Sequence, residues 1–253
     1  MLTKLLKYEF RASFRELGPL YAALLGVAFL VRPSFYRLDF SGTITGMTMI
    51  VYTALMIAVL VVSCITIIQR FTKTMLGSEG YLMHTLPVSA STHILSKLIV
   101  AMVIVVAGIV VGMFSILITA MDKLVFQVFW EEVLAALYDI FGSYGPLAAI
   151  EMVLLGIFGY AQGILMIYTA ACIGHLFPRG RALISVLSFI AMSSVLGEIT
   201  DLLQELFQQV VGESYGSYSH YMSLLPELVT SVLICIGLFC AVRYVLENRL
   251  NLD

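Results

Sequence analysis

Ionisable side chains are scarce in this sequence, and those that fall inside its apolar stretches are the first candidates for chemistry. Of 253 residues, 12% are charged and 60% are hydrophobic. Glu151 and Glu227 each lie near one end of an apolar stretch. An ionisable group in such a place is by default a candidate functional residue. One interpretation of the two acids is contact with cargo or a role in gating; the other is a solvated position at the rim.

Other ionisable groups give weaker indications of catalysis. Glu131 and Glu132 form a carboxylate pair of the kind that intramembrane proteases carry, but neither a downstream arginine at the expected turn nor a membrane-embedded histidine pair accompanies them. We interpret them as part of an outer-face helix. His175 and His220 fall in different segments of the chain, too far apart to share a metal. We therefore expect no catalytic residues and no metal site.

The four cysteines lie inside apolar stretches, with no C-x-x-C pair and no clustered histidines. This pattern supports neither a disulfide framework nor a zinc site. We interpret them as buried small hydrophobic residues. They are Cys64, Cys172, Cys235 and Cys240.

The apolar residues gather in long blocks, which excludes an ordinary soluble domain. Mean hydropathy is +1.00. In soluble domains about a quarter of the residues are charged, against 12% in this chain. A bilayer core of about 30 Å is crossed by about 20 helical residues. The sequence therefore predicts an all-α integral membrane protein, with a single transmembrane domain over residues 1–253.

Six transmembrane helices are predicted, together with amphipathic interfacial helices at the N-terminus and on the outer face. Residues 1–17 carry a basic stripe and an apolar stripe, and no A-x-A-like cleavage site follows them, so we expect an interfacial helix instead of a signal peptide. Outer amphipathic helices are expected around Trp130 and beyond Leu202. The expected spans are residues 18–31, 43–69, 98–121, 147–177, 182–198 and 224–242.

The orientation follows from the basic residues. With six spans, eleven of the 14 Lys and Arg residues fall on one side; Arg32, Arg37 and Lys123 fall on the other. By the positive-inside rule the first side is cytosolic. Both termini are then expected in the cytosol, together with the loop of residues 70–97.

That loop is the longest polar passage with basic residues between two expected spans. Within it, residues 81–86 are expected to form one or two helical turns that end at Pro87. The next helix can begin at Ser89 or Ser91 and continue directly into the third span. The short helix has an apolar side that needs either a protein partner or the lipid surface, and the residues alone favour neither.

The segment GSEGYLMHTLPVSASTHILSKL resembles the loop between the second and third spans in the type-2 permeases of ATP-binding-cassette exporters. That family commonly shows an acidic residue and Gly, a short helix ending in an apolar-Pro-apolar-Ser run, and an apolar stretch ending in Gly/Ser-Lys-Leu. The basic N-terminal helix and the six spans resemble the family plan as well. The matching positions are Glu79, Gly80, Leu86, Pro87, Val88, Ser89, Ser96, Lys97 and Leu98.

The resemblance implies that the short helix is a coupling helix that docks on an ABC ATPase subunit. This chain contains no G-x-x-x-x-G-K-[ST] motif, so ATP and Mg would be bound by the partner, and the chain itself would not be an enzyme. The implied ATPase-coupling residues are Glu79, Gly80, Tyr81, Leu82, Met83, His84, Leu86, Pro87 and Ser89.

The expected assembly is a homodimer, or a heterodimer with a similar permease, in a bacterial cell (plasma) membrane. Its expected partners are the ATPase and membrane lipid, with no nucleic acid. The expected function is export of an amphipathic solute: a peptide, a drug or a lipid-like molecule.

Two other functions stay open. An ion-gradient-driven secondary carrier would have charged residues and broken helices at mid-membrane, and this sequence offers few of either. A non-transporting scaffold or sensor subunit would bind a partner tightly without any turnover of substrate.

Overall fold

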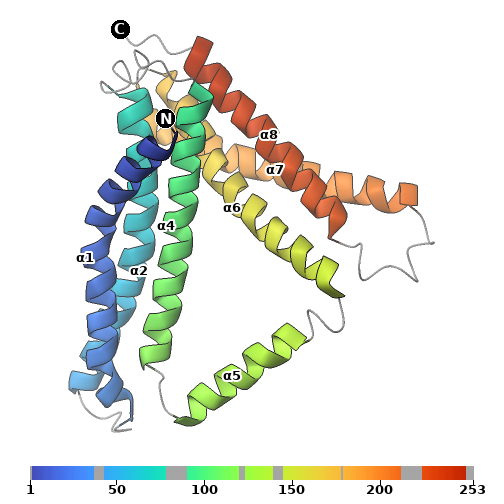
Figure 1. Ribbon diagram of the computed structural model, residues 1–253. Helices are drawn as coiled ribbons and strands as arrows, with labels where there is room; N and C mark the ends of the chain where they lie inside the picture. Colours follow the sequence, from blue (N-terminus) through green and yellow to red (C-terminus); the bar gives the residue numbers. More distant parts are fainter. Residues whose placement is uncertain are drawn as a thin grey trace. The chain divides into compact units, whose positions relative to one another are not determined.

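A computed structural model describes residues 2–36, 43–77, 90–119, 123–138, 145–177, 179–211 and 224–248. Over these residues the chain is 97% helical and contains no strand, which confirms the predicted all-α class. The α-helices (Figure 1) are α1 (Leu2–Tyr36), α2 (Thr43–Phe71), α4 (Ala90–Thr119), α5 (Lys123–Tyr138), α6 (Gly145–His175), α7 (Arg181–Val211) and α8 (Leu225–Asn248). A short π-helix, η1 (Thr72–Leu76), follows α2 directly.

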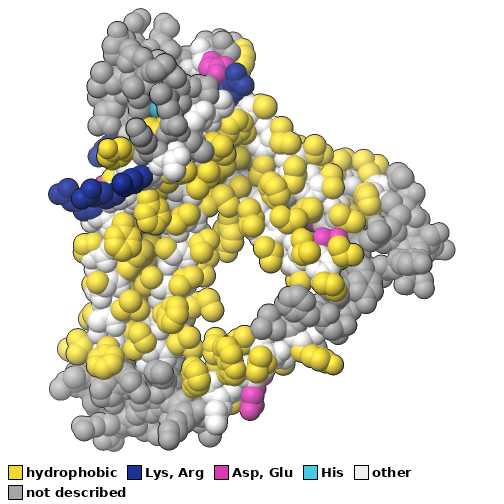
Figure 2. Space-filling model, in the orientation of Figure 1, with side chains coloured by type: hydrophobic (Ala, Val, Ile, Leu, Met, Phe, Trp, Pro, Cys, Tyr) yellow, Lys and Arg dark blue, Asp and Glu magenta, His cyan; other side chains and the backbone are white. Residues whose placement is uncertain are grey.

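Six of the described helices are long and apolar enough to cross a membrane, as the sequence predicts. Hydrophobic side chains cover much of their visible surface (Figure 2). Helix α5, with 16 residues, is shorter than a span needs. The six segments are Leu5–Val31, Gly46–Leu76, Ala90–Thr119, Ala149–His175, Arg181–Phe207 and Leu225–Glu247. The protein is therefore a multi-pass membrane protein.

Helix α1 joins two segments that the sequence pattern separates. The expected interfacial helix of residues 1–17 and the expected span of residues 18–31 are one continuous helix of 35 residues. Pro19 lies inside it without ending it. A proline removes one N–H group, and spanning helices tolerate that loss where neighbouring groups satisfy the freed carbonyl. The first span can thus use residues on both sides of position 18.

Helix α7 is likewise continuous where the sequence suggests a boundary. The apolar character falls at Glu198, yet the helix runs through Arg181–Val211. The Thr200 hydroxyl donates to the Leu196 carbonyl at 2.7 Å, which is compatible with unbroken helix. The change from an apolar to an amphipathic pattern marks a change of surroundings and not an end of the helix.

The chain divides into two compact units. Unit 1 holds Met1–Gln69 and Ile99–Leu134, and includes α1 with most of α2 and α4. The Tyr21 hydroxyl donates to the Ile104 carbonyl at 3.4 Å, and the Ser115 hydroxyl donates to the Tyr52 hydroxyl at 2.8 Å. These buried bonds connect α1 to α4 and α2 to α4. Hydrogen bonds of this kind commonly stabilise the packing of transmembrane helices.

Unit 2 holds Arg70–Leu98 and Ala135–Asp253. Helix α6 packs against both α7 and α8. Gly180, with a φ of +76°, forms the turn before α7, a conformation that glycine adopts without strain. Its carbonyl accepts the Ile184 N–H at 3.0 Å. Between α6 and α8, the Cys235 thiol donates to the Phe158 carbonyl at 3.4 Å.

Candidate functional site

The predicted coupling helix lies outside the described residues, but both ends of its loop are described. Residues 78–89, and with them the coupling positions Glu79 to Ser89, are not among the residues that the structure describes. Within the loop of residues 70–97, α2 ends at Phe71 and α4 begins at Ala90. Both flanks belong to unit 2, so their packing against each other and against α6 can be followed residue by residue.

The first flank contains the π-helix η1. It follows α2 without a break, and Met75 and Leu76 are buried. Gly77 then takes an extended conformation (φ −98°, ψ −172°). A Cβ atom at Gly77 would lie 2.7 Å from the Lys73 carbonyl oxygen, so only glycine leaves the helix here without displacing backbone. Short π-helical turns occur frequently at functional sites.

The second flank is the first part of α4. The helix begins at Ala90, one residue from each of the two predicted starts, Ser89 and Ser91, and runs without interruption into the third span. Ser96, Lys97 and Leu98 are all buried, although three successive residues point to different sides of a helix. This part of α4 is therefore enclosed on more than one side, while Leu95 is exposed.

A single carbonyl links the two flanks. The Lys97 ammonium donates to the Arg70 carbonyl oxygen at 3.3 Å, and the Thr74 hydroxyl donates to the same oxygen. The carbonyl end of an α-helix carries partial negative charge. A buried cation from the returning helix thus compensates the end of α2 at the point where it changes into η1.

Tyr168 of α6 contacts both flanks of the loop. Its hydroxyl donates to the Lys97 carbonyl at 3.3 Å. Its ring stacks on Phe71, with centroids 4.0 Å apart and planes 8° from parallel. Both rings are at most 2% exposed. We call Arg70, Phe71, Thr74, Lys97 and Tyr168 the loop joint, since these residues connect both flanks of the loop to α6.

The loop joint combines residues that the sequence places in different roles. Lys97 belongs to the Ser-Lys-Leu ending of the loop motif, whereas Arg70 appears in the sequence only as one of the cytosolic cations. Tyr168 lies 71 positions after Lys97, inside an apolar stretch that gives no sign of its partner. Sequence reasoning missed Phe71, Thr74 and Tyr168 as joint residues.

The two candidate acids lie at the same end of unit 2. The Cys235–Phe158 bond sets α8 beside α6; Glu151 precedes Phe158 by seven positions and Glu227 precedes Cys235 by eight. Because α6 and α8 run in the same direction (Figure 1), each acid lies about 10–12 Å before this level at about 1.5 Å per residue. Both are partly buried. The Glu151 Oε2 atom is buried and has no hydrogen-bond partner among the described residues.

The possible metal ligands and the cysteines are the remaining candidates for chemistry. No group of three or more His, Cys, Asp or Glu side chains that could hold a metal ion occurs among them. Cys172 and Cys235 are buried as predicted, while Cys64 and Cys240 are exposed on their helices. What the described site can do is mechanical: it holds two helix ends and a third helix together at the base of a loop.

Comparison with protein families, characterised proteins and solved structures finds no match to this chain.

Proposed function

We propose that this chain is the membrane subunit of an ATP-driven exporter of the ATP-binding-cassette type, and that residues 79–89 receive the force of a separate ATPase. The observation that carries the proposal is the loop joint, with its Lys97–Arg70 hydrogen bond. A polar loop between two long apolar helices transmits force only if its base is stiff. Stacked rings, a buried lysine and a helix that continues from the loop into a span provide that stiffness.

In this mechanism the partner ATPases close on ATP and displace the coupling helix. The displacement passes through Ala90 into α4 and through η1 into α2, because both continue as spanning helices. Tyr168 carries the same movement to α6 through the Lys97 carbonyl. ATP and Mg stay on the partner, because this sequence has no phosphate-binding G-x-x-x-x-G-K-[ST] loop.

The proposed assembly is a pair of such membrane subunits with two ATPases, in a bacterial cell membrane and with both termini in the cytosol. Two copies suit a chain of six spanning helices, which is few for an enclosed path. The cargo class that fits an apolar path is an amphipathic solute, such as a peptide, drug or lipid-like molecule.

Glu151 is the proposed cargo contact or gating acid within this mechanism, with Glu227 at the same end of unit 2. Its buried Oε2 atom lacks a partner among the described residues, and burying a carboxylate oxygen without one is costly. A cationic or hydrogen-bond-donating group of the cargo would offset that cost. Glu151→Gln should then lower transport of such a cargo and leave ATPase binding unchanged.

The test of the proposal is purification of the tagged chain from its native membrane in mild detergent. The expected companion is a soluble protein with a Walker-type nucleotide site. Replacing Leu82 and Leu86 by Asp puts charge on the apolar side of the coupling helix and should release that companion. Thr85→Asp adds a charge at a polar position of the same loop and should retain it.

Three outcomes would contradict the proposal. The chain could purify alone and transport solute under an ion gradient, which is the behaviour of a secondary carrier. It could bind a partner tightly with no ATP-dependent turnover, which is the behaviour of a scaffold or sensor. The Thr85→Asp control could also lose the ATPase as completely as the double variant does.

A further inference from the structure

Unit 1 contains a pocket of about 680 Å³ between the first turns of α1 and the part of α4 that follows the loop. This volume lies within the range of about 300–1,000 Å³ that is usual for ligand pockets. Its α4 wall consists of Ile99, Val100 and Val103. Neither the candidate acids nor the loop joint takes part in it, so it is independent of the proposed function.

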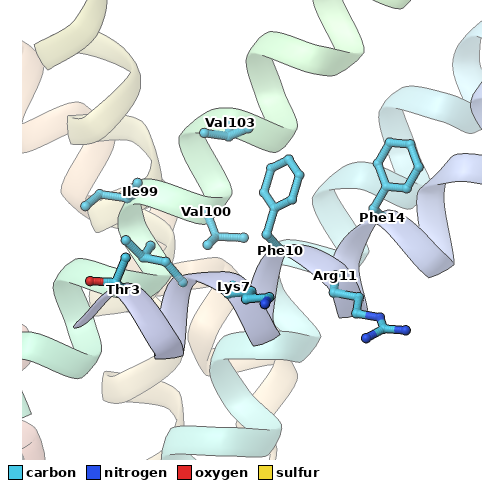
Figure 3. A pocket seen from close by; sticks show the side chains of 9 residues that line it. Thr3, Lys7, Phe10, Arg11, Phe14, Ile99, Val100 and Val103 are labelled. Carbon is cyan, nitrogen blue, oxygen red and sulfur yellow. The ribbon is translucent and has the colours of Figure 1, made fainter. Parts of the chain in front are cut away.

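The apolar wall of the pocket continues on α1. Phe10 rises from α1 beside Val100 and Val103, and Phe14 follows one turn further along the helix (Figure 3). The two phenylalanines are 46% and 63% exposed. About half of the Phe10 surface and more than half of the Phe14 surface therefore stay uncovered, and the two rings border an open apolar trough between α1 and α4.

Two cations lie beside this trough. Lys7 and Arg11 also line the pocket, and both side chains are exposed. They are four residues apart, so they lie on one face of α1, one turn from each other. Arg11 extends away from the apolar wall in Figure 3. The pocket therefore has an apolar interior, contributed by α1 and α4, and a positively charged rim, contributed by α1 alone.

We propose that this pocket binds an anionic phospholipid. An acyl chain lies along the phenylalanines and valines, and the lipid phosphate accepts hydrogen bonds from Lys7 and Arg11. The charge pattern selects this occupant: a hydrocarbon chain alone gains nothing from the two cations, and a soluble phosphate gains nothing from the trough. Each Lys or Arg near an anionic membrane surface contributes about 1 kcal/mol of attraction, so two cations favour an anionic lipid over a neutral one.

The experiment measures thermal unfolding of the full chain in detergent with added lipid, together with native mass spectrometry of bound lipid. Phosphatidylglycerol should raise the unfolding temperature and remain bound in the spectrometer. Phosphatidylcholine, which has equal chains and no net charge, should do neither. Glycerol phosphate, a headgroup without chains, should have no effect either.

Two variants separate the charges from the trough. Lys7→Gln with Arg11→Gln should weaken phosphatidylglycerol binding by about 30-fold, from the usual contribution of two interfacial cations. Val103→Trp keeps both cations and fills the trough, and should abolish retention of the lipid. The matched control is Arg15→Gln, which removes an exposed cation of the same helix that does not line the pocket; its binding should equal that of the unchanged protein.

The proposal is overturned if phosphatidylcholine stabilises the protein as much as phosphatidylglycerol does. A loss of binding in Arg15→Gln as large as in Lys7→Gln alone or in Arg11→Gln alone also overturns it, because the attraction would then belong to the whole basic helix. Unchanged lipid retention in Val103→Trp removes the trough as the binding site. None of these outcomes depends on an ATPase, so failure here is distinct from failure of the transport proposal.

Discussion

The Arg70 carbonyl is the atom on which the base of the loop depends. It accepts hydrogen bonds from the Thr74 hydroxyl and from the Lys97 ammonium. The bond from Thr74 spans four positions, and a threonine in any helix can form such a local bond. Lys97 comes from the far end of the loop, so its bond forms only when the two flanks are correctly paired. This long-range bond is what distinguishes a joint from a simple helix end.

Replacing Lys97 by Met should therefore destabilise the protein. The substitution keeps the length of the buried side chain and removes the charged donor, at a cost of about 1.5–3 kcal/mol for a hydrogen bond to a charged group. The measurement is thermal unfolding in detergent. Lys73→Met is the matched control, since Lys73 is exposed in the adjoining π-helix; a loss as large in the control would contradict the role of Lys97.

Tyr168 makes two separable contributions to the joint. Tyr168→Phe removes the hydroxyl bond to Lys97 and keeps the ring on Phe71, so it should cost about 1 kcal/mol. Tyr168→Leu also loses the stack and should cost about 0.5–1.5 kcal/mol more. Unfolding temperatures should fall in that order. Tyr160→Phe, on the exposed side of α6, should change little, and an equal fall there would argue against the joint.

At the scale of helices, the turn between α6 and α7 depends on Gly174. A Cβ atom there would lie 2.6 Å from the Arg181 carbonyl oxygen and would also collide with the Ser185 hydroxyl. Gly174→Ala must therefore move backbone, and we expect a loss of about 1–3 kcal/mol. Gly163→Ala, on the same helix with no atom within 4 Å of its Cβ, should be neutral or stabilising. Parallel unfolding curves of the two variants test this difference.

A pair of glycines in α4 lacks such close contacts. Gly108 and Gly112 of α4 have the G-x-x-x-G spacing that often permits close helix contact. A Cβ atom at Gly108 would meet only the Tyr21 hydroxyl, at an ordinary 3.5 Å, and one at Gly112 would meet nothing within 4 Å. The described residues thus give this spacing no role in packing within the chain.

Helices and their approximate limits could be predicted because hydropathy is a local signal. The amphipathic helix around Trp130 follows directly from it, and the start of α4 follows from another local signal, the capping serines Ser89 and Ser91. The continuity of α1 and α7 could not be predicted in this way, since a helix that leaves the apolar layer changes composition without changing backbone. The loop joint was also out of reach, because Phe71 and Tyr168 lie far apart in the sequence.

At the scale of the whole molecule, six spanning helices place successive loops on opposite sides of the membrane. A cysteine introduced at Lys73 or Arg181 should react with an impermeant maleimide only in inside-out vesicles. A cysteine at Glu131, on α5, should react only in intact cells. All three side chains are exposed. Labelling of positions 73 and 131 from the same side would contradict six spans, and the reverse pattern would contradict the orientation.

If residues 79–89 touch an ATPase, as proposed, a photoreactive phenylalanine analogue at position 82 should capture that contact. In cells, illumination should join this chain to a protein with a Walker-type nucleotide site, and the yield should change when ATP is depleted. The same analogue at Leu134, on α5, should yield no such product. Cross-links from position 82 to lipid alone, or to proteins without a nucleotide site, would contradict the account.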